Sequence, residues 1–167
     1  GSLPGTLTIA AGSTSGTINI PGVVDDALDE VNETVTVTLS NAGNATLGDN
    51  DTHTYTIEDN DAAPTVNFSS TSSSGAESVS SKSLTVELSA ASGQDVTVAY
   101  AFTGTAGASG VDHSAVNGTL TIAAGDTSGT ITIPSIVDDS LDESNETVIV
   151  TLSSPNNASL GTDIAHT

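Results

Sequence analysis

The chain has 167 residues and a formal net charge of −20, because a single basic residue, Lys82, stands against 21 acidic ones. A surface of this sign repels nucleic-acid phosphates and anionic lipid headgroups, so both are disfavoured as partners. The chain has no cysteine, which excludes a disulfide framework and thiol chemistry. It also has no run of about 18 apolar residues, so we expect no membrane-spanning helix.

An internal repeat determines how the sequence divides. Residues 5–54 align without a gap on residues 118–167, at an offset of 113, and 35 of the 50 aligned positions are identical. We therefore predict that residues 1–61 are the C-terminal half of one repeat, with its last four strands. Residues 62–167 are predicted to be the next repeat, which lacks its final strand.

In the first part of the chain, apolar residues alternate with threonine and other polar residues, as in half-buried antiparallel strands. Strands with their apolar side chains facing a core are therefore predicted over residues 6–9, 17–21, 34–39 and 53–58. The glycine- and serine-rich stretch 12–16 between the first two is typical of a turn.

The same alternation continues through the second repeat. Val66 and Phe68 mark a strand after Pro64, and residues 104–116 are predicted to be a long loop. The remaining strands are predicted over residues 82–89, 95–103, 119–122, 130–134 and 147–152. No segment has helical spacing. The sequence thus predicts an all-β fold, a seven-stranded antiparallel β-sandwich of immunoglobulin-like size with a repeat of about 113 residues.

Two acidic loops lie between predicted strands. Residues 138–146 carry five acidic side chains, and the equivalent residues 25–33 carry five more, so together they hold ten of the 21. Calcium prefers hard oxygen ligands such as these, whereas soft metals would require cysteine or clustered histidine. The spacing is not that of an EF-hand. A solvated acidic surface is the alternative interpretation of such a run.

The motifs resemble those of the Calx-beta family. A Gly-x-Leu-Thr-Ile segment is followed by Thr-Ile-x-Ile, then by Asp-Asp-x-x-x-Glu-x-x-Glu before a strand, and the repeat closes on Asp-Asn-Asp at residues 59–61. The resemblance covers nearly the whole chain. Modules of this family occur in the regulatory loop of sodium/calcium exchangers and repeatedly in large bacterial surface proteins. The resemblance implies a β-sandwich with Ca²⁺ bound at one end.

The resemblance also implies which residues would be ligands. In the second repeat they are Glu77, Asp112, Asp138, Asp139, Glu143 and Glu146, and in the first they are Asp25, Asp26, Glu30, Glu33, Asp59 and Asp61. The chain departs from the family pattern at His113, where an aromatic residue usually follows the loop Asp.

No catalytic site is predicted. The sequence Asp112-His113-Ser114 contains the residue types of a hydrolase relay, but adjacent side chains of an extended chain point in opposite directions. We therefore expect a protein that is not an enzyme.

The function that we expect is structural. The chain is interpreted as a piece of a tandem array in a large extracellular or cell-surface protein of the adhesin type, in which calcium-binding repeats extend and rigidify a stalk. Its expected partners are then neighbouring repeats of the same chain. Two alternatives remain: a protein- or glycan-binding adhesion module, and a regulatory calcium sensor as in sodium/calcium exchangers.

The position of the repeat within the chain predicts an unusual edge. A second repeat without its last strand leaves a sheet edge with which another strand can pair. Residues 52–58 are the equivalent strand of the first repeat, so we expect them to complement a second repeat. This can occur within the chain or by exchange with a second copy, which would give a homodimer or an open assembly.

Overall fold

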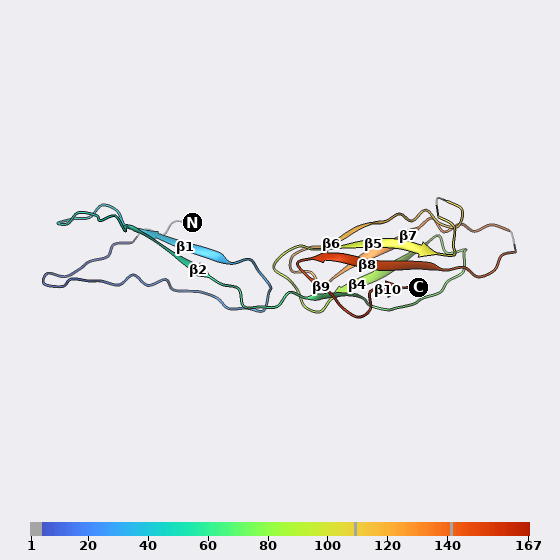
Figure 1. Ribbon diagram of the computed structural model, residues 1–167, viewed down its shortest axis with the longest axis horizontal. Coiled ribbons are helices and arrows are strands. Elements are labelled where there is room, and N and C mark those ends of the chain that lie inside the picture. Colours follow the sequence, from blue (N-terminus) through green and yellow to red (C-terminus); the bar gives the residue numbers. More distant parts are fainter. Residues whose placement is uncertain (1–4, 109, 141) are drawn as a thin grey trace.

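The computed structural model describes residues 5–108, 110–140 and 142–167. The chain is elongated and has two lobes, with β1 and β2 in the N-terminal lobe and the other eight strands in the C-terminal lobe (Figure 1). The described residues form strands and turns without a helix, which confirms the all-β prediction. Accordingly, this part of the chain contains no helix with the length and apolarity needed to cross a membrane.

Two four-stranded sheets form the C-terminal lobe. The first has the order β7-β4-β3-β9, and its strands are β3 (Thr65–Phe68), β4 (Ser81–Leu88), β7 (Ser128–Pro134) and β9 (Ser159–Leu160). Its strands pair antiparallel except β3 and β9, which are parallel.

The second sheet has the order β10-β8-β5-β6 and is antiparallel throughout. Its strands are β5 (Val96–Gly104), β6 (Gly118–Ile122), β8 (Val148–Asn156) and β10 (Ala165–His166). The two sheets face each other, so the predicted β-sandwich is confirmed.

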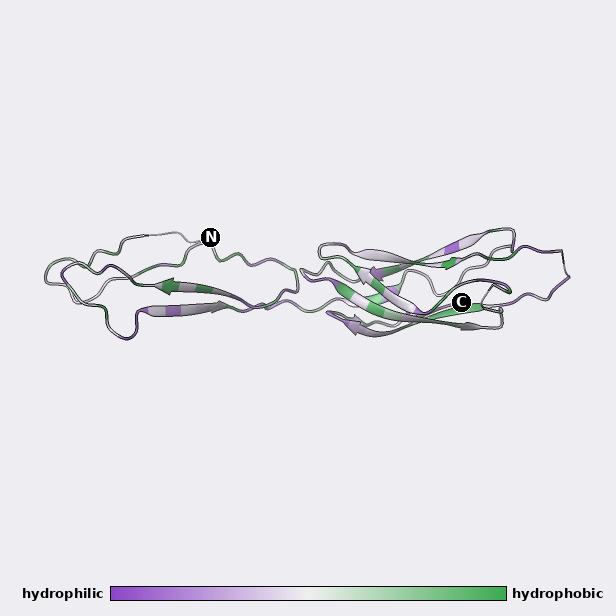
Figure 2. Cartoon of the chain, turned by 90° about the horizontal axis from the view of Figure 1, so that it is seen from above, coloured by the Kyte–Doolittle hydropathy of each residue, from purple (hydrophilic) through white to green (hydrophobic). Residues whose placement is uncertain are grey.

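One hydrophobic core lies between these sheets, and the period-2 alternation of the sequence explains it. In β4, for example, every second residue from Leu84 onward is buried, while the residues between them face solvent. The most deeply buried apolar side chains come from both sheets; they include Val66, Val86, Val96, Val98, Ile122, Ile131, Val150 and Leu152. Figure 2 shows the hydrophobic positions recurring along these strands.

The N-terminal lobe has a single hairpin, in which β1 (Glu33–Thr38) pairs antiparallel with β2 (Thr52–Ile57). The strands predicted over residues 6–9 and 17–21 do not form, and this part of the prediction is wrong. Ile9 is 51% exposed, whereas its equivalent Ile122 is 2% exposed; Ile18 is 46% exposed, against 2% for Ile131.

The difference has a physical cause. In the C-terminal lobe, β6 pairs with β5 and β7 pairs with β4. The chain contains no counterparts of β4 and β5 for the first repeat, so residues 6–9 and 17–21 have neither a ladder partner nor an opposing sheet. Alternation alone does not hold a strand together, because its stability comes from cross-strand pairs and burial.

The last strand has the same register in both lobes. Val37 pairs with His53 in the hairpin, and Val150 pairs with His166 in the C-terminal lobe, each 113 residues further on. β10 of the second repeat is therefore the equivalent of the first two residues of β2. Within the chain, β2 pairs with β1, and neither sheet of the C-terminal lobe includes it. The predicted complementation within one chain is therefore not what the structure has.

Candidate metal centre

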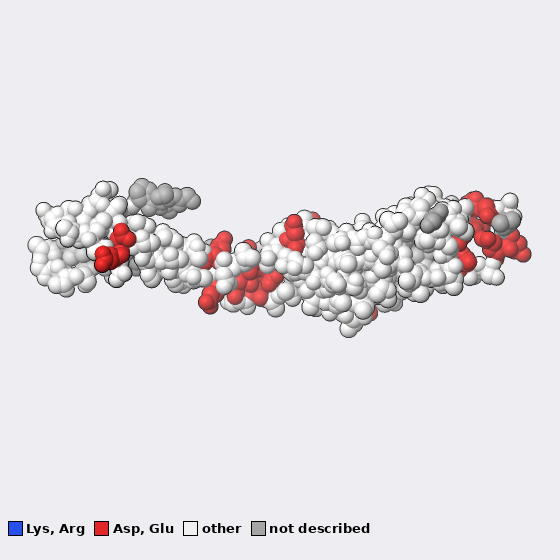
Figure 3. All heavy atoms as spheres, turned by 45° about the horizontal axis from the view of Figure 1, so that its top comes forward, with Lys and Arg blue, Asp and Glu red and all other residues white. Residues whose placement is uncertain are grey.

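Six of the predicted ligands meet at the joint between the lobes. Antiparallel pairing places Glu33, at the start of β1, opposite Ile57, at the end of β2. The loop before β1 and the segment after β2 therefore lie at the same end of the hairpin. Their acidic side chains line one hollow; they are Asp25, Asp26, Glu30, Glu33, Asp59 and Asp61, which we call the junction cluster. Figure 3 shows acidic atoms concentrated at this joint.

The carboxylates of the junction cluster interact electrostatically. The pKa of Glu30 is raised above its ordinary value, first by the neighbouring negative charge of Asp26 and then by partial desolvation and other cluster members. The pKa of Asp61 is raised mainly by desolvation and further by Asp59. Lys82, the single basic residue of the chain, belongs to β4 rather than to this hollow. The cluster is thus a site of concentrated negative charge.

Backbone contacts hold the segments of the joint together. The Asp59 N–H donates a hydrogen bond to Asn32 Oδ1 at 2.9 Å, which ties the segment after β2 to the loop before β1. Asp29 faces the other lobe: its carbonyl oxygen accepts from the Gly93 N–H at 3.0 Å and from the Ser92 hydroxyl at 3.3 Å. Ser92 is buried in this contact. The loop that carries the acids therefore also docks against the second repeat.

This docking role of Asp29 was not found from the sequence. Asp29 lies within the acidic run, where it is indistinguishable by type from its neighbours. Its partners Ser92 and Gly93 lie in the loop between β4 and β5, and the sequence of this loop indicates only a turn. No sequence signal links the two loops.

A second acidic group lies at the far end of the C-terminal lobe (Figure 3). The pKa of Glu146 is raised, first by a side-chain hydrogen bond with Asp112 and further by the charge of Glu143. Asp112 is held in place because its carboxylate accepts from the Gly107 N–H and its carbonyl from the Val137 N–H. We call Asp112, Glu143 and Glu146 the far-end cluster.

The other predicted ligands of the second repeat come from two further loops. Glu77 lies in the loop between β3 and β4, and Asp138 and Asp139 lie in the loop between β7 and β8. Nothing in the described part of the chain joins Glu77 or Asp138 to the far-end cluster. Sequence reasoning thus located the acidic end of this lobe, where Glu146 interacts with Asp112 and Glu143.

The chemistry of both clusters fits a hard cation. All the donors are carboxylate oxygens, which suit Ca²⁺ and not a soft metal. Within residues 5–108, 110–140 and 142–167, however, no group of three His, Cys, Asp or Glu side chains has the geometry of a closed metal site. The clusters gather the donors, and coordination would require the carboxylates to move closer together.

His113 occupies a position inside the core. Its ring is buried, its Nδ1 accepts the Ala115 N–H at 3.1 Å, and its centroid lies 6.4 Å from that of Phe102. Here it packs as an aromatic residue would, which accounts for the departure from the family pattern and removes it from any catalytic role with Asp112 and Ser114.

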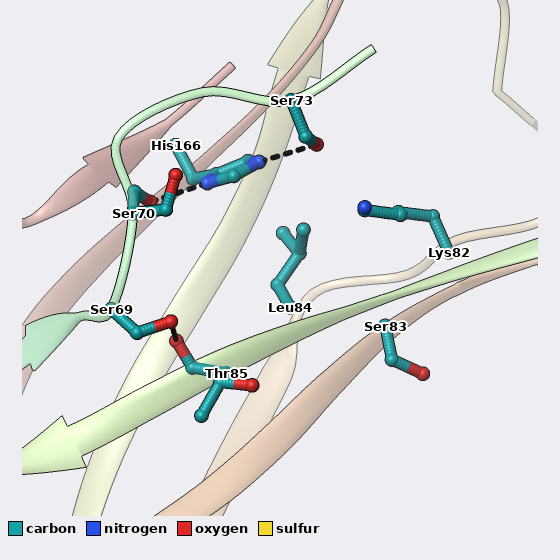
Figure 4. Close-up of a pocket in the computed structure, with 8 residues that line it drawn as sticks. All are labelled: Ser69, Ser70, Ser73, Lys82, Ser83, Leu84, Thr85 and His166. Atoms are coloured by element: carbon teal, nitrogen blue, oxygen red, sulfur yellow. Dashed lines mark hydrogen bonds between the residues drawn. The ribbon is translucent and has the colours of Figure 1, made fainter. Parts of the chain in front are cut away.

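His166 is also buried, next to Phe68 at a centroid distance of 5.7 Å. It borders a cavity of about 230 Å³, whose lining includes Ser73, Lys82 and Leu84 (Figure 4). Its Nδ1 contacts the Ser70 carbonyl oxygen at 2.5 Å, and because a carbonyl only accepts, Nδ1 carries the proton. Nε2 then accepts the Ser73 hydroxyl at 2.8 Å. In the hairpin the equivalent His53 is exposed.

Comparison with known proteins places the chain in a family. The sequence model of the Calx-beta domain matches residues 2–61 and again residues 59–165. A comparison with curated proteins found no match. Among solved structures, the chain is similar to the apo-form Calx CBD1 domain, with 20% identity and a TM-score of 0.57 over 63% of this chain and 93% of that one.

A second similar structure is CBD12 from CALX1.2, with 23% identity and a TM-score of 0.48 over 80% of this chain and 52% of that one. The likeness to CBD1 shows the fold, and the two sequence matches together span almost the whole chain. The chain therefore belongs to the Calx-beta domain family.

Proposed function

We propose that the chain is a calcium-binding structural module, in which Ca²⁺ held by the junction cluster stiffens the joint between consecutive repeats of an extracellular or cell-surface protein. The observation that carries this proposal is the position of the cluster. Six carboxylates line one hollow at the joint, and the loop before β1, which carries three of them, also docks against the next repeat through Asp29.

Electrostatics explains why a cation would stiffen the joint. Without a cation, the carboxylates of the hollow repel one another, as the raised pKa values of Glu30 and Asp61 indicate. Repulsion favours separation of the two segments that carry them, the loop before β1 and the segment after β2. A divalent cation reverses the sign of this interaction and draws the same segments together.

The family supports the choice of cation. Its calcium-binding members hold their ions at one end of the sandwich, on loops with the acidic pattern found here. The mechanical role is supported by the high identity of the two repeats, because a stalk uses similar units end to end. No reaction is proposed.

The test is a thermal melt of metal-stripped protein with excess Ca²⁺, excess Mg²⁺ or chelator. A ligand that binds only the folded state stabilises it by about 2.7 kcal/mol at 100 times its dissociation constant, so Ca²⁺ should raise the midpoint by several degrees. Mg²⁺ should raise it less, because it loses its water shell reluctantly.

A matched pair of variants locates the effect. The double variant Asp59→Asn/Asp61→Asn should lose most of the calcium-dependent rise. The control Asp49→Asn/Asp126→Asn removes the same charge outside both clusters and should keep it. Equal responses in the two variants, or no response in the unmodified protein, would contradict the proposal.

A further inference from the structure

Residues 92–94 of the second repeat, which we call the docking loop, bind a single residue of the first repeat. The Asp29 carbonyl oxygen accepts from the Gly93 N–H and from the Ser92 hydroxyl, and Asp29 and Ser92 form a parallel backbone bridge. The Asp29 carboxylate also accepts from the Gln94 side-chain amide at 3.5 Å. Three consecutive residues of one lobe therefore contact Asp29 of the other.

The docking loop is anchored within its own lobe. The Ser92 carbonyl oxygen accepts from the Gly125 N–H at 2.8 Å, and the Ser92 hydroxyl oxygen accepts from the Gln94 N–H at 3.1 Å. Directly after the loop, Asp95 Oδ1 accepts from the Ala124 N–H at 2.9 Å. None of these bonds involves the N-terminal lobe. A surface that is ordered by its own contacts loses little conformational freedom on binding, so the loop is a preformed docking surface.

Gly93 lies beneath the residue that follows Asp29. Its backbone is outside the left-handed region, so its conformation does not require glycine. A Cβ on Gly93, however, would lie 2.5 Å from Glu30 Cγ and 2.9 Å from Glu30 Oε1. A favourable contact between two carbon atoms is about 3.5–4.0 Å long. The Glu30 side chain therefore occupies the space that any side chain at Gly93 would need.

Glu30 connects the docking loop to the junction cluster. Its side chain lines the hollow of the cluster, and its backbone directly follows Asp29. The bonds to Asp29 hold the backbone on one side of Glu30, and the contact with Gly93 limits where the Glu30 side chain can lie. The second repeat thus determines part of the geometry of a carboxylate that belongs to the first.

We propose that Gly93 of the second repeat is a positioning residue for Glu30 of the first. Its N–H holds the neighbouring Asp29, and the absence of a side chain leaves the space in which Glu30 lines the hollow. Where it concerns calcium, this inference rests on the proposed function. If Ca²⁺ binds the cluster, its affinity is set in part by the following repeat, and by linkage Ca²⁺ strengthens the docking of that repeat.

Nuclear magnetic resonance of the metal-free protein tests the contact itself. The Glu30 Cγ protons should give a nuclear Overhauser effect to the Gly93 Cα protons, because Glu30 Cγ lies against the Gly93 backbone. This measurement does not depend on calcium. Absence of the effect in the unmodified protein would overturn the proposal.

Gly93→Ala tests the consequence for binding. The variant keeps the N–H that donates to Asp29, and the exposed Glu30 side chain can rotate away from the new methyl group. We therefore expect the lobes to stay docked and Ca²⁺ to bind several-fold more weakly in calorimetric titration. The control is Gly75→Ala, in the loop between β3 and β4, where a Cβ would meet no atom within 4 Å beyond its chain neighbours. This variant should bind Ca²⁺ as the unmodified protein does.

The same substitution in a Glu30→Ala background separates positioning from a general structural effect. If Gly93 acts through Glu30, then Gly93→Ala/Glu30→Ala should bind Ca²⁺ as Glu30→Ala does, because no carboxylate remains to be displaced. An equal loss of affinity in both backgrounds, or no loss in either, would overturn the positioning role. The expected Overhauser effect without any Ca²⁺ binding by the unmodified protein would support the contact, and would overturn the proposed function and the calcium part of this inference.

Discussion

The N-terminal lobe and the second half of the C-terminal lobe have similar sequences and different structures. Residues 118–134 form β6 and β7 around a packed core, while residues 5–21, which share most of their side chains, form no strand. The hairpin β1–β2 forms in the first repeat because each of its strands supplies the other's partner within the chain. The contrast shows that the alternating pattern specifies which side chains can face a core, and that long-range partners decide whether the strand forms.

The largest effect is expected at a pair of equivalent positions, one buried and one exposed. Ile122→Ala removes a buried side chain and should lower the free energy of unfolding by about 2–5 kcal/mol, because it leaves a cavity. Ile9→Ala, at the equivalent exposed position, should change it by less than about 0.5 kcal/mol. Urea unfolding followed by tyrosine fluorescence or circular dichroism measures both. Similar losses for the two variants would mean that residues 6–9 are packed in solution.

A smaller effect is expected where the lobes touch. Ser92→Ala removes a buried hydroxyl that donates to the Asp29 carbonyl oxygen and accepts from the Gln94 N–H at 3.1 Å. We expect a loss of about 1–2 kcal/mol in unfolding of the C-terminal lobe, together with a more flexible joint. Small-angle scattering should then show a broader distribution of lobe separations.

Ser128→Ala is the matched control, since Ser128 is exposed and pairs through its backbone. If Ser92→Ala and Ser128→Ala have the same effect, the contact between the lobes contributes nothing to either property.

The smallest expected effect is on how stability depends on pH. The sign of this dependence should change when Ca²⁺ is bound. The raised pKa values of Glu30, Asp61 and Glu146 mean that the folded state binds protons more tightly than the unfolded state. Their stabilising contribution is therefore present below the ordinary carboxyl pKa and is lost as pH rises through the raised values. Metal-stripped protein should thus be slightly more stable near pH 5 than at pH 7, as measured by thermal melts in metal-free buffer.

With Ca²⁺ present the order should reverse, because protons and Ca²⁺ compete for the same carboxylates. An identical dependence of stability on pH with and without Ca²⁺ would mean that these acids do not bind Ca²⁺.

Much of the second repeat could be predicted from its sequence. The alternation of Leu84, Val86 and Leu88 identifies the buried face of β4, and Ile131 and Ile133 do the same for β7. These predictions succeed because both sheets that the pattern requires are present in the chain. The two-residue β9 was missed, since it pairs parallel with β3 through a contact too short to leave a pattern.

The candidate site was predictable in composition and less so in geometry. The acidic runs and the Asp-Asn-Asp segment identify the junction cluster because strand pairing brings their ends together. The docking of Asp29 against the other lobe depends on a contact with Ser92 that no local pattern encodes. The burial of His113 likewise depends on how the loop 104–116 folds back over the core.

Calorimetric titration of metal-stripped protein with Ca²⁺, with the unmodified chain and Asp59→Asn/Asp61→Asn in parallel, tests the junction cluster most directly. We predict saturable binding to the unmodified chain and a loss of at least one binding event in the variant. Absence of binding to the unmodified chain at millimolar Ca²⁺, or the same isotherm for both proteins, would contradict a calcium site at the joint.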